Sequence, residues 1–267
     1  MAKLYIVGTP IGNLGDITLR ALDILRAADH IACEDTRHSR PLLENYGIRA
    51  PLIAYHKFNE HECADKIADI VESGKSVALI TDAGMPCVSD PGATVVARFH
   101  ERGLPVECVP GPSAVTAAAA LSGMTERGFV FLGFLPDKAA QRRKKVESAA
   151  ASGLPLVIYA APHDVGETAA FLGEVLGDRR VAAVREITKL HESVTFSTLK
   201  NFECEERGEI VLVVEGREPE GPLLSLPPEE HLAAVIASGV PEKEAVKRVA
   251  AARGVPKNEI YKLTVRE

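Results

Sequence analysis

The sequence contains no tryptophan, and aromatic residues make up only 5% of its 267 residues. Its five cysteines are odd in number and lack a CxxC pair, which is typical of reduced thiols in a cytosolic protein and not of a disulfide framework or a zinc site. It also lacks a hydrophobic run long enough to cross a membrane, and glycine and proline interrupt residues 1–14 too early for a signal peptide. We therefore expect a cytoplasmic protein that is independent of metals and membranes.

Positive charge is scarce as well. The chain has 31 Lys and Arg against 37 Asp and Glu, a net charge of −6, so it cannot coat nucleic acid without a local basic patch. Neither GxGxxG nor GxxxxGK[ST] occurs, so the phosphate-binding loops of dinucleotide enzymes and P-loop NTPases are missing. A 46% hydrophobic and 25% charged composition is that of a globular protein with a substantial core.

Alternating strand and helix patterns predict an α/β fold. From Leu4 to Val109, short β-rich runs alternate with helical stretches, including helices over residues 16–28 and 60–72, which implies a parallel sheet with helices on its faces. Asp90 and Pro91 are expected to act as N-cap and first-turn residue of the last of these helices. The pattern restarts near residue 129, and its strand-rich later part predicts a mixed sheet with antiparallel pairs. The rest of the chain has a helical pattern, which predicts a small C-terminal appendage. We therefore expect three domains, residues 1–116, 117–225 and 226–267.

Unusual loops follow three of the predicted parallel strands. They are residues 8–14 (GTPIGNL), 81–92 (TDAGMPCVSDPG) and 110–118 (PGPSAVTAA). Ligands bind beyond the carboxyl ends of parallel strands, so the loops could share one crevice. Taken alone, each of these glycine-proline loops is more often a tight connector, but the three together favour a shared site.

These segments also carry a resemblance to a known family. VGTPIGNLGDIT, EDTRHSR, TDAGMPCVSDPG, VPGPSA, GFLP, YAAPH and REITKLHE, in this order from Val7 to Glu192, resemble the bacterial 16S rRNA 2'-O-methyltransferases that act on cytidine, within the tetrapyrrole methylase-like superfamily. The resemblance implies S-adenosylmethionine as methyl donor in a cleft between two α/β domains. It also implies a homodimer and a small-subunit ribosomal RNA substrate, with a cytidine ribose in the decoding region as target.

The family pattern assigns a set of donor-binding residues by position. They are Pro10, Ile11, Asp82, Ala83, Gly84, Met85, Pro86, Ser113, Ala114, Tyr159, Ala160 and Pro162. Ser113 and Ala114 would offer amide donors at a helix N-terminus, where an anion is favoured. For Asp82 a turn or cap role is the alternative, and for Tyr159 simple core packing.

Methyl transfer to a ribose hydroxyl needs a positioned nucleophile and a proton acceptor, and a cation can stabilise the developing alkoxide. REITKLHE supplies candidates, because in an extended conformation Lys189 and His191 point to one side. We assign Lys189 as alkoxide stabiliser or base, oriented by Glu192 and His191. Rim charges or RNA-phosphate contacts are the alternative.

Basic residues that could contact RNA occur in three places: Arg37, beside His38; the run Arg142, Arg143, Lys144 and Lys145; and Lys247 and Arg248 in the basic tail, which resembles a helix-turn-helix module. Helix capping and solvated helix faces are the alternatives.

Two other functions stay open: a methyltransferase acting on a tetrapyrrole or a protein, or a non-catalytic RNA-binding ribosome factor.

Overall fold

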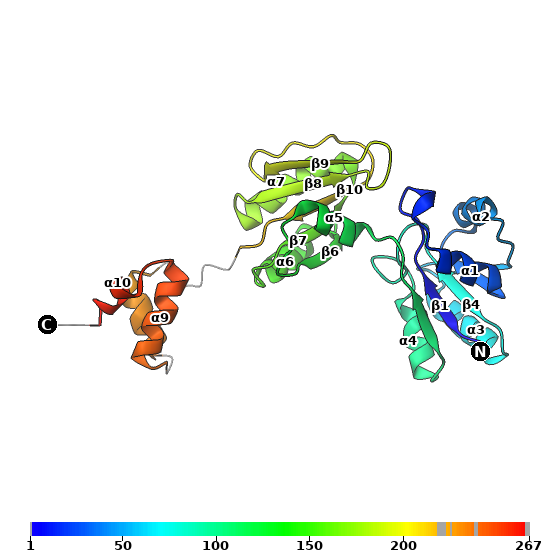
Figure 1. Ribbon diagram of the computed structural model, residues 1–267, viewed down its shortest axis with the longest axis horizontal. Helices are drawn as coiled ribbons and strands as arrows, with labels where there is room; N and C mark the ends of the chain where they lie inside the picture. Colours follow the sequence, from blue (N-terminus) through cyan, green and yellow to red (C-terminus); the bar gives the residue numbers. More distant parts are fainter. Residues whose placement is uncertain (1, 218–222, 225, 238–239, 265–267) are drawn as a thin grey trace. The chain divides into compact units, whose positions relative to one another are not determined.

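The computed structural model describes residues 2–217, 223–224, 226–237 and 240–264. The chain divides into a large unit, residues 1–150 and 154–216, and a small unit, residues 151–153 and 217–267. The large unit contains two five-stranded sheets (Figure 1). The predicted boundaries at residues 116 and 225 stay predictions, and residue 225 lies outside the described residues.

The first sheet is entirely parallel, with the strand order β3-β2-β4-β1-β5. Its strands are β1 (Leu4–Val7), β2 (His30–Cys33), β3 (Leu52–Ala54), β4 (Val77–Ile80) and β5 (Val106–Val109). Its helices are α1 (Leu19–Ala27), α2 (Thr36–Asn45), α3 (Glu60–Glu72) and α4 (Ala93–Glu101). The α/β class and the parallel sheet expected from the sequence are confirmed.

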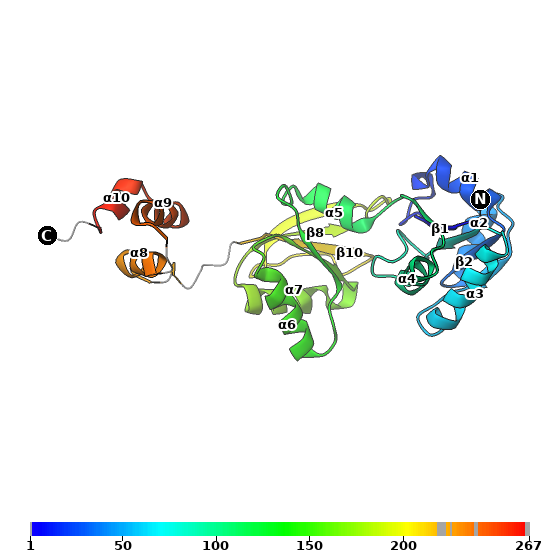
Figure 2. The same ribbon diagram turned by 90° about the horizontal axis from the view of Figure 1, so that it is seen from below.

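Alternation along these strands decides which helix covers which face. Leu4 and Ile6 of β1 join one buried cluster with residues of α3 and α4, whereas Val7 joins another with Ala21 and Leu25 of α1. Successive strand side chains point to opposite faces, so both faces of this sheet are buried. Figure 2 shows α1 and α2 on one side of the strands and α3 and α4 on the other.

The second sheet is mixed, as predicted, with the order β6-β7-β10-β8-β9. Only β6 and β7 run parallel, and the other neighbours are antiparallel. Its strands are β6 (Val130–Phe134), β7 (Leu156–Ala160), β8 (Arg180–Arg185), β9 (Ser193–Thr198) and β10 (Ile210–Val214). Its helices are α5 (Ala114–Ser122), α6 (Ala139–Ala150) and α7 (Val165–Leu176).

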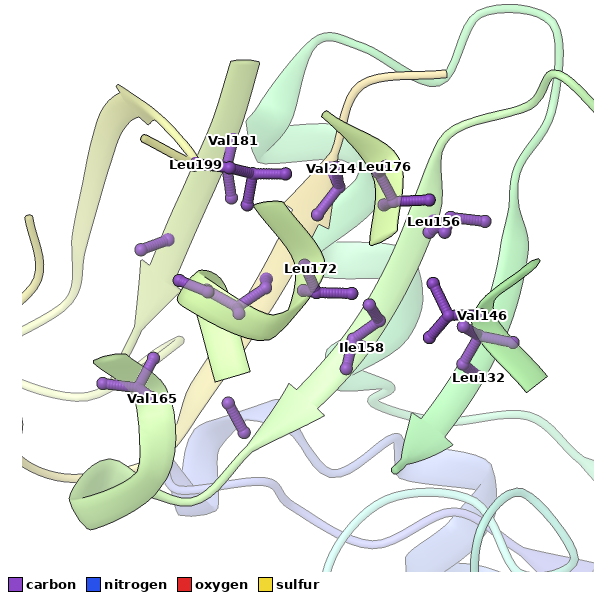
Figure 3. Close-up of a cluster of buried hydrophobic side chains, with 14 of the residues drawn as sticks. Leu132, Val146, Leu156, Ile158, Val165, Leu172, Leu176, Val181, Leu199 and Val214 are labelled. Carbon is purple, nitrogen blue, oxygen red and sulfur yellow. The ribbon is translucent and has the colours of Figure 1, made fainter. Parts of the chain in front are cut away.

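The core of the second sheet has the same two-sided construction. Figure 3 shows Leu172 of α7 and Val146 of α6 packed against Ile158, Leu156 and other strand side chains, all buried. The alternate strand residues, Val157 among them, pack on the opposite face against Val115 and Ala118 of α5. The small alanines of α5 allow this helix to lie close to the sheet.

The small unit has its own core. Its helices are α8 (Pro228–Ala237), α9 (Glu242–Arg253) and α10 (Lys257–Tyr261), and Leu232, Val249 and Ile260 are buried among them. The Arg253 side chain donates hydrogen bonds to His231 Nδ1 and to the carbonyls of Leu223 and Leu226. In the described part of the chain, every helix is too short or too polar to span a membrane.

The predicted cap of α4 is wrong. The helix begins at Ala93, and its N-cap is Gly92 at φ 140°, without a side-chain cap. A Cβ at Gly92 would meet Cys87 Sγ at 2.6 Å, so the chain folds back on itself here and a glycine is required at the turn. Asp90 therefore lies in the loop that precedes the helix.

Candidate active site

The loops after β1, β4 and β5 meet at one edge of the first sheet. Thr9 and Gly84 exchange backbone hydrogen bonds of 2.9 and 3.2 Å, which join the first loop to the second. The backbone N–H of Gly8 donates a hydrogen bond to the carbonyl of Val109. The backbones of Gly8 and Gly111 lie so close together that a Cβ on Gly8 would be 2.8 Å from Gly111 Cα. The crevice expected from the strand ends is therefore built from direct backbone contacts.

A cavity of about 370 Å³ lies at this edge. Nine of the twelve predicted donor-binding residues line it: Ile11, Ala83, Gly84, Met85, Ser113, Ala114, Tyr159, Ala160 and Pro162. These residues come from all three loops, from the end of β7 and from the turn that follows it. The structure thus brings together residues up to 151 positions apart in the chain, from Ile11 to Pro162.

Pro10, Asp82 and Pro86 do not line this cavity. The Asp82 carboxylate instead accepts a hydrogen bond from His38 Nδ1 at 3.1 Å, at the exposed entrance to α2. Asp82 therefore links the loop after β4 to the first turn of α2. Donor binding stays a prediction for all twelve residues.

Tyr159 combines packing with exposure to the cavity. Its ring makes edge contacts with Phe131 and Phe134 at centroid distances of 5.0 and 5.4 Å. Burial, with smaller contributions from Asp90 and Glu209, raises the pKa of Tyr159 to about 12, so its hydroxyl stays protonated at neutral pH. Tyr159 therefore packs against two aromatic rings and also lines the cavity, and its binding of the donor stays a prediction.

Sequence reasoning missed several lining residues: Val88, Asp90, Phe134, Ala161, Gly208, Glu209, Ile210 and Val211. Gly208 and Glu209 directly precede β10, and Ile210 and Val211 begin it. This strand pairs with β7 and β8 in an antiparallel register. A hydrophobic run such as EIVLVV identifies a strand but not its neighbours, so nothing in the pattern placed its first residues at the cavity.

The segment carrying Lys189 is a turn and not the extended chain that we expected. Glu186 and Thr188 have φ values of 50° and 65°, and Lys189 and Glu192 donate backbone hydrogen bonds to the carbonyls of Glu186 and Lys189. The Thr188 hydroxyl donates to Asp16, and Asn13 donates to the Thr188 carbonyl. These contacts fix the turn against the loop after β1.

The Lys189 ammonium lies between two carboxylates, 2.9 Å from Glu186 Oε1 and 3.1 Å from Glu209 Oε2. Burial lowers the pKa of Lys189, but the hydrogen bonds to Glu186 and Glu209 outweigh it and the net shift is upward. The ammonium is therefore charged at neutral pH, and its stem packs where a Cβ of Gly12 would lie.

In the described structure, the residues expected to orient Lys189, Glu192 and His191, make no recorded contact with its ammonium. The Glu192 carboxylate accepts a hydrogen bond from the backbone N–H of Thr188, and His191 is exposed. The partners of Lys189 are Glu186 and Glu209. The sequence pattern pointed to neither, because Glu209 is twenty positions away and Glu186 reaches Lys189 through the turn. They are brought together by the β8–β10 pairing, in which Arg185 lies opposite Ile210.

The predicted RNA-binding residues differ in how free their charges are. Arg37 is exposed but paired with Asp35 at 2.7 Å, and Lys247 and Arg248 lie 3.5 and 3.8 Å from Glu244. Arg142 and Arg143 stack over Phe171. The Lys145 ammonium donates to the carbonyl of Leu132 at 2.7 Å, whereas Lys144 is exposed and has no recorded partner in the described structure.

Metal ligation is not suggested by the geometry. Across residues 2–217, 223–224, 226–237 and 240–264, no group of three or more His, Cys, Asp or Glu side chains is arranged to hold a metal ion.

A family model described as tetrapyrrole (corrin/porphyrin) methylases matches residues 3–203, which include the whole first sheet, strands β6 to β9 of the second, and the cavity lining from Ile11 to Pro162. The chain belongs to this methylase family. Curated relatives have the name ribosomal RNA small subunit methyltransferase I. The one from Bacillus subtilis (strain 168) is 40% identical over 98% of this chain and 93% of its own length. The one from Mesorhizobium japonicum is 41% identical over 97% of this chain and 90% of its own length.

Another relative of this methylase-family chain is shorter. The protein of the same name from Thermotoga maritima is 41% identical over 82% of this chain and 100% of its own length. Solved structures share the fold at lower identity. Diphthine synthase superposes with a TM-score of 0.63 at 16% identity, covering 80% of this chain and 90% of its own. A uroporphyrin-III-C-methyltransferase from Thermus thermophilus superposes at 0.57 with 20% identity, covering 80% and 94%.

Proposed function

We propose that this protein uses S-adenosylmethionine to methylate the ribose 2'-hydroxyl of a cytidine in the RNA of the small ribosomal subunit. The observation that carries the proposal is about 40% identity, over nearly the full chain, to relatives named ribosomal RNA small subunit methyltransferase I. The motifs of the sequence agree with it. The target nucleotide rests on the resemblance alone.

The cavity fits the proposed donor. Its volume of about 370 Å³ lies within the range of small-molecule sites, and its described lining contains no Lys, Arg or His that would repel a sulfonium. Gly84, Ala83 and Ala160 present backbone atoms without bulk. The free amides at the start of α5, beside Ser113, suit a carboxylate. When bound, S-adenosylmethionine supplies an electrophilic methyl group.

The protein's own residues would prepare the hydroxyl that receives this methyl group. Lys189 is charged and held by Glu186 and Glu209, so it suits stabilisation of a developing alkoxide better than proton abstraction. The ammonium has three donors, two of which these carboxylates occupy. His191 and Glu192, with their exposed positions beside it, are proposed to contact the RNA or to support the turn.

Substrate RNA is proposed to contact Arg37, Arg142, Arg143, Lys144, Lys145, Lys247 and Arg248, with the active chain a homodimer in the cytoplasm. Exposure and the absence of a recorded partner in the described structure support Lys144 most strongly. The case for an RNA contact is weakest for Lys145, because its ammonium already donates hydrogen bonds to two carbonyls of β6.

The function is tested by mapping small-subunit ribosomal RNA by mass spectrometry from cells with and without this protein. We expect one ribose methyl group to be lost from a cytidine and restored by the gene in trans. An unchanged methylation pattern, or a methylated tetrapyrrole or protein produced by the purified enzyme, would contradict the proposal.

Deleting residues 227–267 should lower methylation of small-subunit RNA while leaving donor binding unchanged. The described lining of the cavity lies entirely between Ile11 and Val211, whereas Lys247 and Arg248 are removed by the deletion. Because these residues would only dock RNA, KM should rise more than about tenfold with a smaller change in kcat. Full activity of the truncated chain, for which the short Thermotoga maritima relative is a precedent in length, would argue against a docking role.

A further inference from the structure

Asp90 is a carboxylate in the cavity wall. In the described part of the chain, no hydrogen bond or ion pair to its side chain is recorded, although it lines the cavity beside Met85 and Tyr159. Its expected role as the cap of α4 is ruled out, because that helix begins at Ala93. Asp90 is half-buried, so its carboxylate is accessible to a group that enters the cavity.

The loop holds Asp90 in place at a cost to the backbone. Cys87 and Ser89 have φ values of 70° and 66°, a conformation that costs non-glycine residues of the order of 1 kcal/mol each. Cys87 N–H donates to the carbonyl of Pro91 at 3.3 Å, and the Ser89 hydroxyl fills the space where a Cβ of Gly133 in β6 would lie. Such strain persists where the surroundings impose it, so the position of Asp90 is fixed from both sides.

The charged and titratable groups around Asp90 all disfavour its ionised form. Burial raises its pKa to about 6, and the carboxylates of Glu34, after β2, and Asp82, after β4, add to the shift. Cys87 and Tyr159 face it as neutral groups, because burial raises their own pKa values to about 11 and about 12. At pH 7.5 Asp90 is ionised, and it is more basic than an ordinary aspartate.

Other titratable groups of the cavity cannot take a proton as readily. Among the described lining residues, Glu209 is paired with Lys189 and Tyr159 keeps its proton. Lys189, which lies outside the lining and pairs with Glu209, is already protonated. Asp90 is therefore the free base among them, with a pKa near the working pH, where general bases are most effective.

We propose that Asp90 is the general base that accepts the proton of the RNA hydroxyl during methyl transfer, an inference that rests on the function proposed above. The hydroxyl oxygen gains the methyl group, whose former bonding pair stays on the sulfur, and the Asp90 carboxylate gains the hydroxyl proton. Charge balances, because the positive charge lost at sulfur is matched by the negative charge neutralised at Asp90. Lys189 stabilises the oxygen while the proton leaves.

The test compares Asp90→Asn with Glu34→Gln, and with Asp23→Asn, an exposed carboxylate of α1, as control. Single-turnover methylation of small-subunit RNA should fall at least about 10²-fold in Asp90→Asn. In the wild type the rate should fall with unit slope below pH 6, where Asp90 becomes protonated. Glu34→Gln should keep the plateau rate and move this acid limb to lower pH, whereas Asp23→Asn should move nothing.

Two measurements that do not depend on turnover complete the test. Calorimetric affinity for S-adenosylmethionine should change less than threefold in Asp90→Asn. The melting temperature of this variant should exceed the wild type's by about 3 °C at pH 7.5 and match it at pH 4. The sign follows because a folded-state pKa above the unfolded value of 3.8 makes ionised Asp90 destabilising above pH 6 and harmless below pH 4.

The outcomes separate this inference from the proposed function. Wild-type protein that methylates small-subunit RNA, together with an Asp90→Asn rate within threefold of it, overturns the role of Asp90 and leaves the function intact. A more than tenfold loss of donor affinity with an unchanged single-turnover rate also overturns it, because Asp90 would then only bind the donor. Wild-type protein that transfers no methyl group to this RNA overturns the function and the inference together.

Discussion

Replacing Lys189 with methionine should lower kcat about 10³-fold, the upper end of the effect of losing one preorganised group that stabilises transition-state charge. The ammonium is positively charged at neutral pH and held by Glu186 and Glu209. A charge that is already in position needs no reorganisation when an oxygen becomes negative. Methionine keeps most of the aliphatic stem that packs against Gly12, so the turn should remain folded.

Donor binding should be nearly unchanged in the same variant, because Lys189 is not part of the cavity lining. Isothermal calorimetry with S-adenosylmethionine should give a Kd within threefold of the wild type, while kcat is measured on small-subunit RNA. Lys189→Arg should recover part of the rate, since it keeps the charge but has a larger, planar head group. Lys75→Met, an exposed lysine outside the site, is the matched control. A Lys189→Met rate within threefold of the wild type would remove this residue from the mechanism.

The fold was predictable where local pattern and burial agree. The predicted helix over residues 60–72 matches α3, because its buried residues Cys63, Ala64, Ile67, Ala68 and Val71 recur at helical spacing. The meeting of the loops after β1, β4 and β5 was also predictable. Parallel strands end at the same edge of a sheet, and the glycines in these loops permit close backbone contact.

The rest of the site depends on contacts that no local pattern encodes. Asp90 followed by proline is a common start for a helix, yet the turn at Gly92 delays α4 and leaves the carboxylate facing the cavity. Glu186 and Glu209 reach Lys189 through the register of two antiparallel strands. The left-handed residues Glu186 and Thr188 turn a segment whose sequence suggested an extended chain. Each of these features is set by tertiary structure.

Replacing Gly8 with alanine should have the largest effect on stability. A Cβ at this position would lie 2.8 Å from Gly111 Cα, 2.9 Å from Gly111 N and 2.7 Å from Met85 Sδ. Met85 could change its rotamer, but the backbone of Gly111 cannot move without separating β1 from β5. These two strands are paired from Leu4 opposite Val106 to Val7 opposite Val109. Such overpacking against backbone should cost about 3 kcal/mol, equivalent to roughly 8 °C in melting temperature.

The same substitution should weaken donor binding, because the loops of Gly8 and Gly111 carry Ile11 and Ser113 into the cavity wall. Gly166→Ala in α7 is the matched control. A Cβ there would meet only the flexible carboxylate of Glu206 at 3.4 Å, and alanine stabilises a helix by about 0.5–1 kcal/mol relative to glycine. Thermal unfolding and calorimetry of both variants measure the two effects. If Gly8→Ala melts as the wild type does, the loops after β1 and β5 are not in the contact that builds this cavity.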